Sequence, residues 1–211
     1  MPSTKLKDFG LYFITDSRLT KRTVIDDAKA AIKGGVKVIQ YREKNAPARR
    51  MILEAKKIKK LCQKNNVLFL VNDSIDVALA VNADGIHIGD DDVPYKYARK
   101  LLGKDKIIGV SAQSVKEALF NEKIGADYTG IGPIYYTATK KINRPIGLAP
   151  IKELKTRLKI PFVAIGGINQ NNIDEILKAG AKNMAVISAI VTKHDVESTV
   201  RDFVRKIKQF K

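Results

Sequence analysis

The sequence predicts an α/β fold, a single (β/α)8 TIM barrel, from three observations. Eight short runs of β-branched and other apolar residues alternate with longer segments of helical periodicity. Several of these runs are almost continuously apolar, as strands of a parallel sheet covered on both faces must be. Eight strand–helix units in 211 residues form one compact barrel. We therefore expect one domain over residues 1–211.

The expected strands share this apolar character. In chain order they are Leu11–Thr15, Val36–Arg42, Val67–Asn72, Gly85–Gly89, Lys106–Ser111, Asp127–Ile134, Pro161–Ile168 and Ala181–Ile190. The structural alternative is a doubly wound open sheet, which requires a glycine-rich turn after the first strand. That position reads Thr15-Asp16-Ser17-Arg18, without such glycines, and this favours the barrel.

The expected helices lie between the strands. They are Asp26–Lys33, Ala48–Asn65, Ser74–Val81, Pro94–Leu102, Ser114–Ile124, Ala149–Leu158, Asn171–Ala179 and Val196–Phe210. Gly34 and Gly35 are typical of a helix end, and Ser114 with Glu117 forms a capping box at a helix start. Only Ile134–Leu148 forms a long irregular stretch, between the sixth strand and its helix.

Composition limits the classes of function. Hydrophobic residues make up 45% of the chain, which excludes wholesale disorder. The net charge is +17 (39 basic minus 22 acidic residues), which is typical either of anionic partners or of a lysine-rich solvated surface. Cys62 is the only cysteine, so an intramolecular disulfide and a cysteine-based zinc cluster are excluded. We expect Cys62 to be buried in its helix.

Two features that the sequence lacks limit the kinds of partner that we expect. No apolar run is long enough to cross a bilayer and no targeting segment is evident, so we expect a cytoplasmic protein without a membrane partner. Aromatic residues do not cluster with the basic ones as a single-strand binder would require, and we expect no nucleic-acid partner. The sequence leaves open whether the chain forms a homo-oligomer.

Polar residues gather where the expected strands end, which is where the functional site of such a barrel forms. In chain order they are Gln40, Arg42, Lys44, Asn72, Asp73, Asp90, Asp91, Asp92, Ser111, Thr137, Thr139, Lys140 and Ser188. Asp73 and Asp92 follow neighbouring strands, and two converging carboxylates suit Mg²⁺. Helix N-capping is the alternative for each of them.

The remaining rim residues indicate phosphate chemistry. Arg42, Lys44 and Lys140 place three positive charges at one rim, facing the expected metal, which points to a diphosphate. Gly166-Gly167 and Ile187–Ala189 lie where loops offer backbone N–H groups to a phosphate, although tight turns also need small residues. Thr137–Lys140 has the character of a lid.

His87 lies within the fourth expected strand, between Ile86 and Ile88. A single histidine in that setting is more often a hydrogen-bonded core residue than a general base. We therefore expect a core residue there and assign it no chemistry.

Nine short segments, taken in chain order, resemble the thiamine phosphate synthase family, and the resemblance spans nearly the whole chain. They are Leu11–Asp16, Gln40–Lys44, Asn72–Asp73, His87–Asp92, Gly109–Ser111, Gly132–Ile134, Thr137–Lys140, Gly166–Ile168 and Ala185–Ile190. The resemblance implies an enzyme, a transferase that joins hydroxymethylpyrimidine diphosphate to thiazole phosphate and releases diphosphate, with Mg²⁺ as cofactor.

The resemblance also implies site residues. The pyrimidine diphosphate would be held by Tyr12, Gln40, Arg42, Lys44, Asn72, Ser111 and Lys140, of which Arg42, Ser111 and Lys140 would be catalytic. The thiazole phosphate would be held by Thr137, Thr139, Gly167, Ile187 and Ser188. The metal would be bound by Asp73 and Asp92. The chemistry expected is a dissociative displacement, for which the rim offers stabilising charges and no strong base.

Two positions depart from the family pattern. Asp90-Asp91-Asp92 replaces a usual Gln-Glu-Asp and adds charge near the metal, and Gln113 stands where a histidine is frequent. Thiazole tautomerase relatives place a catalytic histidine at that position, so Gln113 speaks against this alternative function. A basic nucleic-acid-binding barrel is the alternative from another class, and its binding would weaken steeply with salt.

Overall fold

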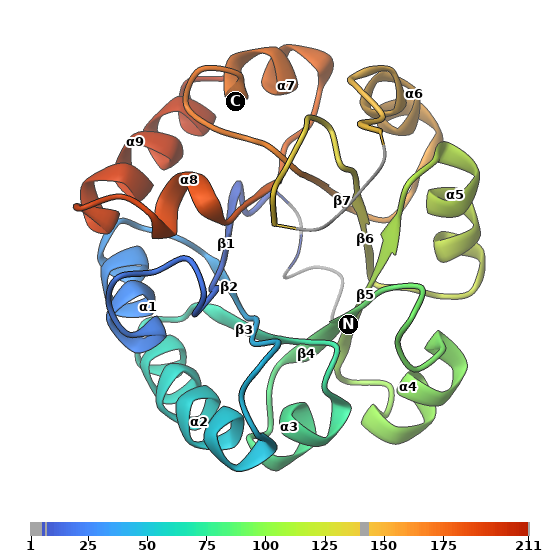
Figure 1. Cartoon of the computed structure of the whole chain (residues 1–211). Coiled ribbons are helices and arrows are strands. Elements are labelled where there is room, and N and C mark those ends of the chain that lie inside the picture. Colours follow the sequence, from blue (N-terminus) through green and yellow to red (C-terminus); the bar gives the residue numbers. More distant parts are fainter. Residues whose placement is uncertain (1–5, 7, 140–143, 211) are drawn as a thin grey trace.

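The computed structural model describes residues 6, 8–139 and 144–210, and within them eight parallel strands form a closed barrel in the order β1 to β8 (Figure 1). The strands are β1 (Leu11–Ile14), β2 (Val38–Tyr41), β3 (Leu68–Asn72), β4 (Gly85–Ile88), β5 (Ile107–Ala112), β6 (Tyr128–Ile131), β7 (Phe162–Ile165) and β8 (Met184–Val186). This confirms the predicted fold class.

Helices surround the strands on the outside (Figure 1). They are α1 (Val24–Lys33), α2 (Ala48–Lys64), α3 (Ile75–Ala80), α4 (Tyr95–Leu102), α5 (Val115–Lys123), α6 (Ala149–Arg157), α7 (Ile173–Ala179), α8 (Ser188–Val191) and α9 (Val196–Gln209). In the described part of the chain, no helix is both long enough and apolar enough to span a membrane.

Local signals in the sequence explain several helix ends. Gly34 caps α1, and Gly35 follows with φ +96°, a backbone conformation that favours glycine. The Ser114 hydroxyl accepts a hydrogen bond from the Glu117 backbone N at 3.2 Å and starts α5. The Glu117 carboxylate reaches the backbone N of Gln113, one residue before the expected partner. Cys62 is buried, as predicted.

The apolar core has two layers. The larger lies between the outer faces of the strands and the helices, and includes Phe13, Ile39 and Phe69. The smaller fills the barrel interior with residues that alternate with these along the strands, among them Tyr12 and Val38. Successive side chains of a strand point alternately to the two layers. Polar residues in register with the interior side chains therefore point into the barrel.

The last three expected strands are too long in the prediction. Strand β6 ends at Ile131, before a cis peptide bond between Gly132 and Pro133. Strand β7 ends at Ile165, since Gly166 takes φ +100°. Strand β8 ends at Val186, and the residues expected to continue it form α8. In each case apolar residues continue past the end of the strand and still pack against the core. A prediction from apolar composition alone therefore makes the strand too long.

Candidate active site

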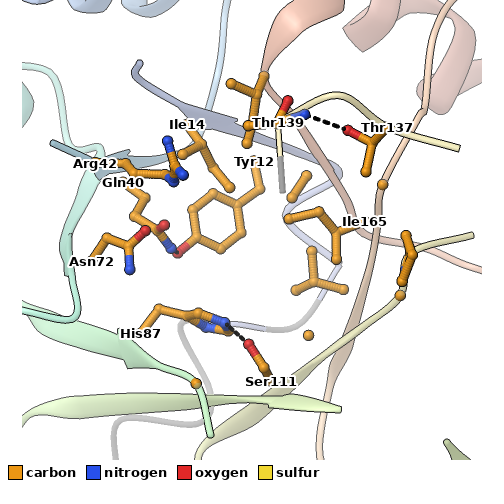
Figure 2. A pocket seen from close by; sticks show the side chains of 18 of the residues that line it. Tyr12, Ile14, Gln40, Arg42, Asn72, His87, Ser111, Thr137, Thr139 and Ile165 are labelled. Carbon is orange, nitrogen blue, oxygen red and sulfur yellow. Dashed lines mark hydrogen bonds between the residues drawn. The ribbon is translucent and has the colours of Figure 1, made fainter. Parts of the chain in front are cut away.

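A cavity of about 270 Å³ opens at the carboxyl ends of the strands (Figure 2). Every site residue expected from the sequence that lies among the described residues lines it: Tyr12, Gln40, Arg42, Lys44, Asn72, Asp73, Asp92, Ser111, Thr137, Thr139, Gly167, Ile187 and Ser188. Lys140 lies outside the described residues. Side chains that are far apart in the sequence therefore surround one cavity.

Two carboxylates meet on the β3–β4 side of this cavity. The side chains of Asp73 and Asp92 interact, and burial together with the hydrogen bond to Asp73 raises the pKa of Asp92. Asp92 Oδ2 accepts a hydrogen bond from the backbone N of Gly89 at 2.7 Å, and Asp73 contacts the Lys44 ammonium and the Asn72 amide. Two like charges this close favour either a shared proton or a bound cation.

Helix capping does not explain these carboxylates. The N-cap of α3 is Ser74 and that of α4 is Pro94, so the capping alternative is wrong for both Asp73 and Asp92. Among the described residues no group of three or more His, Cys, Asp and Glu side chains could hold a metal. Two carboxylates alone would leave most ligand positions of a bound cation to water or to substrate oxygens.

Arg42 lies on the β2 side of the cavity, at the predicted rim, but the expectation that its side chain is exposed there is wrong, because it is mostly buried. Its side chain is 12% exposed, because its NH1 group contacts the buried carboxylate of Asp16. Burial lowers the pKa of Arg42, and the charge of Asp16 opposes this. The backbone N of Arg42 donates to the Thr15 hydroxyl at 3.0 Å.

Asp16, which follows β1 at the same rim, was not among the predicted site residues. Burial alone would raise the pKa of Asp16, but hydrogen bonds from Arg18 and the charge of Arg42 lower it overall. Thr15 and Asp16 form the carboxyl end of the first strand. Reading that strand end in the same way as the others would have found them.

A chain of hydrogen bonds crosses the cavity floor. The Gln40 amide donates to the Tyr12 hydroxyl at 2.8 Å, and this hydroxyl pairs with that of Tyr128 at 2.9 Å. His87 Nδ1 lies 2.9 Å from the Tyr128 hydroxyl, and His87 Nε2 lies 3.0 Å from Ser111 Oγ. Burial raises the pKa of both tyrosines, so they stay protonated and can donate.

This chain of contacts includes two residues that the sequence analysis did not assign to the site. His87 is hydrogen-bonded, as expected, but it also lines the cavity beside Ser111 (Figure 2). Tyr128 points inward opposite Gly109, where an added Cβ would lie 2.0 Å from the Tyr128 ring. Gly109 therefore leaves the space that the Tyr128 ring occupies.

The β6–β8 side of the cavity is built mainly from backbone and small side chains. Gly167 has φ +67°, and a Cβ on it would lie 2.4 Å from the Tyr136 carbonyl oxygen, so only glycine fits. The side-chain amides of Asn169 and Asn172 donate to the Gly167 carbonyl at 3.2 and 3.0 Å. These two hydrogen bonds fix the orientation of the Gly167 carbonyl.

Two further segments complete that side. Thr137 and Thr139 come from the loop after β6, and the Thr139 backbone N donates to the Thr137 hydroxyl at 3.3 Å (Figure 2). Ile187 and Ser188 lie where β8 passes into α8. Hydroxyls and backbone N–H groups can bind one phosphate group without adding a fixed charge.

Comparisons with known proteins agree with this geometry. Residues 11–190 match the family model described as "Thiamine monophosphate synthase". The chain is 47% identical over 208 residues to the thiamine-phosphate synthase of Methanosarcina barkeri, covering 98% of this chain and 94% of that protein. It is 48% identical over 192 residues to that of Clostridium novyi, with 90% and 94% covered. The solved thiamine phosphate pyrophosphorylase of Pyrococcus furiosus superposes with a TM-score of 0.89 at 40% identity, covering 96% of this chain and 97% of that one.

Proposed function

This chain belongs to the thiamine monophosphate synthase family, and from this premise we propose how its pocket makes thiamine phosphate. The reaction is a transfer in which hydroxymethylpyrimidine diphosphate loses diphosphate and is joined to thiazole phosphate. One observation carries the assignment of roles: charged residues that follow β2, β3 and β4, with Ser111 of β5, face the same cavity as the mainly small residues that follow β6 to β8. Residues 1–211 would act as one catalytic domain.

The diphosphate group would bind on the charged side. Arg42 and Lys44 supply positive charges, and Asn72 and Ser111 supply hydrogen-bond donors. Lys140, which lies outside the described residues, is proposed as a further cation. The carboxylates of Asp73 and Asp92 would hold Mg²⁺, which when bound offsets the charge of the diphosphate oxygens.

The pyrimidine ring would lie over the cavity floor, against Tyr12 and Gln40. The ring is electron-rich, so it can stabilise a cation at its methylene carbon as the diphosphate departs. Such a dissociative step needs no nucleophile from the protein and no strong base. The chain's own task is to stabilise the departing negative charge, which is the proposed catalytic role of Arg42, Lys140 and Ser111.

The thiazole phosphate would bind on the opposite side, to Thr137, Thr139, Gly167, Ile187 and Ser188. Anchoring the phosphate there directs the thiazole nitrogen toward the methylene carbon. Holding two reacting atoms in line accelerates their reaction strongly without any added chemistry. The shape of the β6–β8 side therefore supports a positioning role.

A two-substrate assay tests the proposal. Purified protein with Mg²⁺ and both phosphorylated precursors should form thiamine phosphate and diphosphate in equal amounts, and omission of either precursor or of Mg²⁺ should abolish both products. Isomerisation of a thiazole carboxylate phosphate without any pyrimidine substrate would instead favour the tautomerase. We also propose a cytoplasmic location, which cell fractionation would test.

A further inference from the structure

The carboxylate of Asp16 is a buried charge beside the pocket to which the proposed reaction gives no role. Its side chain is 1% exposed. Oδ1 accepts hydrogen bonds from the backbone N and the Nε of Arg18 at 3.1 and 3.0 Å, and Oδ2 accepts one from Arg18 NH2 at 2.8 Å. Oδ2 also contacts NH1 of Arg42. A carboxylate is buried at acceptable cost only when it is paired in this way.

Arg42 is the one of these two arginines that lines the cavity. Among the described residues, its guanidinium makes its hydrogen bond through NH1 to Asp16, so its Nε and NH2 groups remain for a ligand. Its backbone is fixed as well, by the 3.0 Å hydrogen bond to Thr15. A guanidinium held by one edge presents its other donors in a fixed orientation, which suits a phosphate oxygen.

We propose that Asp16 is a positioning residue that orients Arg42 toward the diphosphate of the pyrimidine substrate. This inference rests on the proposed function. Two arginines share one carboxylate, so one positive charge remains for the anion. Without Asp16, the Arg42 guanidinium would lose its hydrogen-bonded counter-charge, keep only the more distant charge of Asp73, and be free to rotate away from the ligand. Asp16 itself touches no substrate, because Arg42 stands between it and the cavity.

Asp27 offers a matched control for the loss of a buried aspartate. It is fully buried and accepts a hydrogen bond from Arg22 Nε at 3.0 Å. The other donors of Arg22 bind backbone carbonyls between the end of α8 and the start of α9, those of Val191, Lys193 and His194. Asp16 and Asp27 thus each hold an arginine, but only the arginine of Asp16 faces the cavity.

The test compares Asp16→Asn with Asp27→Asn by steady-state kinetics with each substrate varied in turn. In Asp16→Asn the KM for the pyrimidine diphosphate should rise about tenfold to a hundredfold, while the KM for the thiazole phosphate stays within about twofold. Asp27→Asn should lower the melting temperature and leave both KM values within about twofold. Equal changes in the two variants, or an unchanged KM in Asp16→Asn, would overturn the proposal.

A double-mutant cycle examines whether the effect passes through Arg42. Adding Asp16→Asn to Arg42→Ala should cause no further loss of kcat/KM, since the residue to be positioned is already gone. A full additive loss would contradict the positioning role. Should Asp16→Asn fail to fold, Asp16→Glu keeps the charge but displaces the carboxylate, and the same change in the pyrimidine diphosphate KM is expected.

Binding of inorganic diphosphate with Mg²⁺, measured by calorimetry, separates this proposal from the function itself. If the wild-type chain makes no thiamine phosphate, the proposed function fails. Weaker diphosphate binding in Asp16→Asn than in Asp27→Asn would still support the positioning role. Absence of diphosphate binding in the wild type, or equal affinities in both variants, would overturn it.

Discussion

The two sides of the cavity use different means to meet anionic groups. On the β2–β5 side, ionised side chains dominate, and several of them contact one another: Arg42 with Asp16, Lys44 with Asp73, and Asp73 with Asp92. On the β6–β8 side, glycines and hydroxyls line the surface, and the hydrogen bonds there involve mainly backbone groups. Figure 2 shows the labelled residues of the two sides facing each other across Tyr12.

This difference matches the two proposed ligands. A departing diphosphate gains negative charge during the reaction, so fixed positive charges there stabilise the transition state more than the bound substrate. A thiazole phosphate keeps its charge throughout and needs only to be held. The first side should therefore govern both kcat and the KM for the pyrimidine diphosphate, whereas the second side should govern mainly the KM for the thiazole phosphate.

The largest effect is expected from Arg42→Ala. It removes a charge that faces the departing group, so kcat/KM should fall about 100- to 1000-fold, which is roughly 3–4 kcal/mol. Because Asp16 keeps Arg18 as a partner, the free energy of unfolding should fall by only about 1–3 kcal/mol. Arg50→Ala is the control, since Arg50 pairs with Glu54 on α2 away from the cavity. Near-normal turnover of Arg42→Ala would contradict the assignment of the departing diphosphate to the charged side of the cavity.

The other side is tested by Gly167→Ala. Its Cβ would overlap the Tyr136 carbonyl and disfavour φ +67°, so the KM for the thiazole phosphate should rise about tenfold or more while that for the pyrimidine diphosphate changes little. Gly147→Ala is matched in backbone conformation, with φ +69°, but nothing lies within 4 Å of its added Cβ. It should cost about 1 kcal/mol of stability and leave kinetics unchanged. Equal kinetic defects in the two variants would contradict this.

Asp92 supplies a pH-dependent test of the charged side. The raised pKa of Asp92 means that it holds its proton to a higher pH than an ordinary carboxyl, and a protonated carboxyl is a poor metal ligand. The Mg²⁺ concentration for half-maximal activity should therefore fall as pH rises through this pKa. Asp92→Asn should raise that concentration on the order of tenfold and flatten its pH dependence. A Mg²⁺ titration at several pH values that is unchanged by the substitution would exclude Asp92 as a ligand.

The smallest effect is expected at the floor between the two sides. Tyr12→Phe leaves the Gln40 amide without its acceptor and should lower the free energy of unfolding by about 1–2 kcal/mol, with a modest rise in the KM for the pyrimidine diphosphate only. Tyr41→Phe loses a comparable hydrogen bond, at 2.8 Å to Glu54, on the outside of the barrel. It should affect the melting temperature but neither KM, and a KM change there would count against a local role for Tyr12.

The alternation of apolar runs and helical segments predicted the order of the barrel strands, because each strand must be apolar on both faces. The strand ends were harder. Ala181–Ile190 reads as one mainly apolar run from Met184 onward, yet it divides into β8 and α8, since the backbone turns at Ile187. The apolar composition predicts that these residues are buried, but it does not predict where the backbone changes direction.

The rule that sites form at strand ends brought most of the lining residues together, including Asp73 and Asp92. It failed where a role depends on a partner distant in sequence. Arg42 is buried because Asp16, on another strand end, neutralises it, and neither residue alone carries that information. Tyr128 was missed because the inward phase of a strand is set by its register with its neighbours.

The pairing of β1 with β8 bears on how the polypeptide is made. The backbone N of Gly10 donates to Asn183 across 173 residues of sequence, at 3.1 Å and in a buried setting. Contacts of such separation incur a large loop-closure entropy and slow folding. During synthesis, the first strand must therefore wait, with its edge unpaired, until the eighth has left the ribosome. The yield of folded protein would then depend on how long this edge stays exposed to other chains.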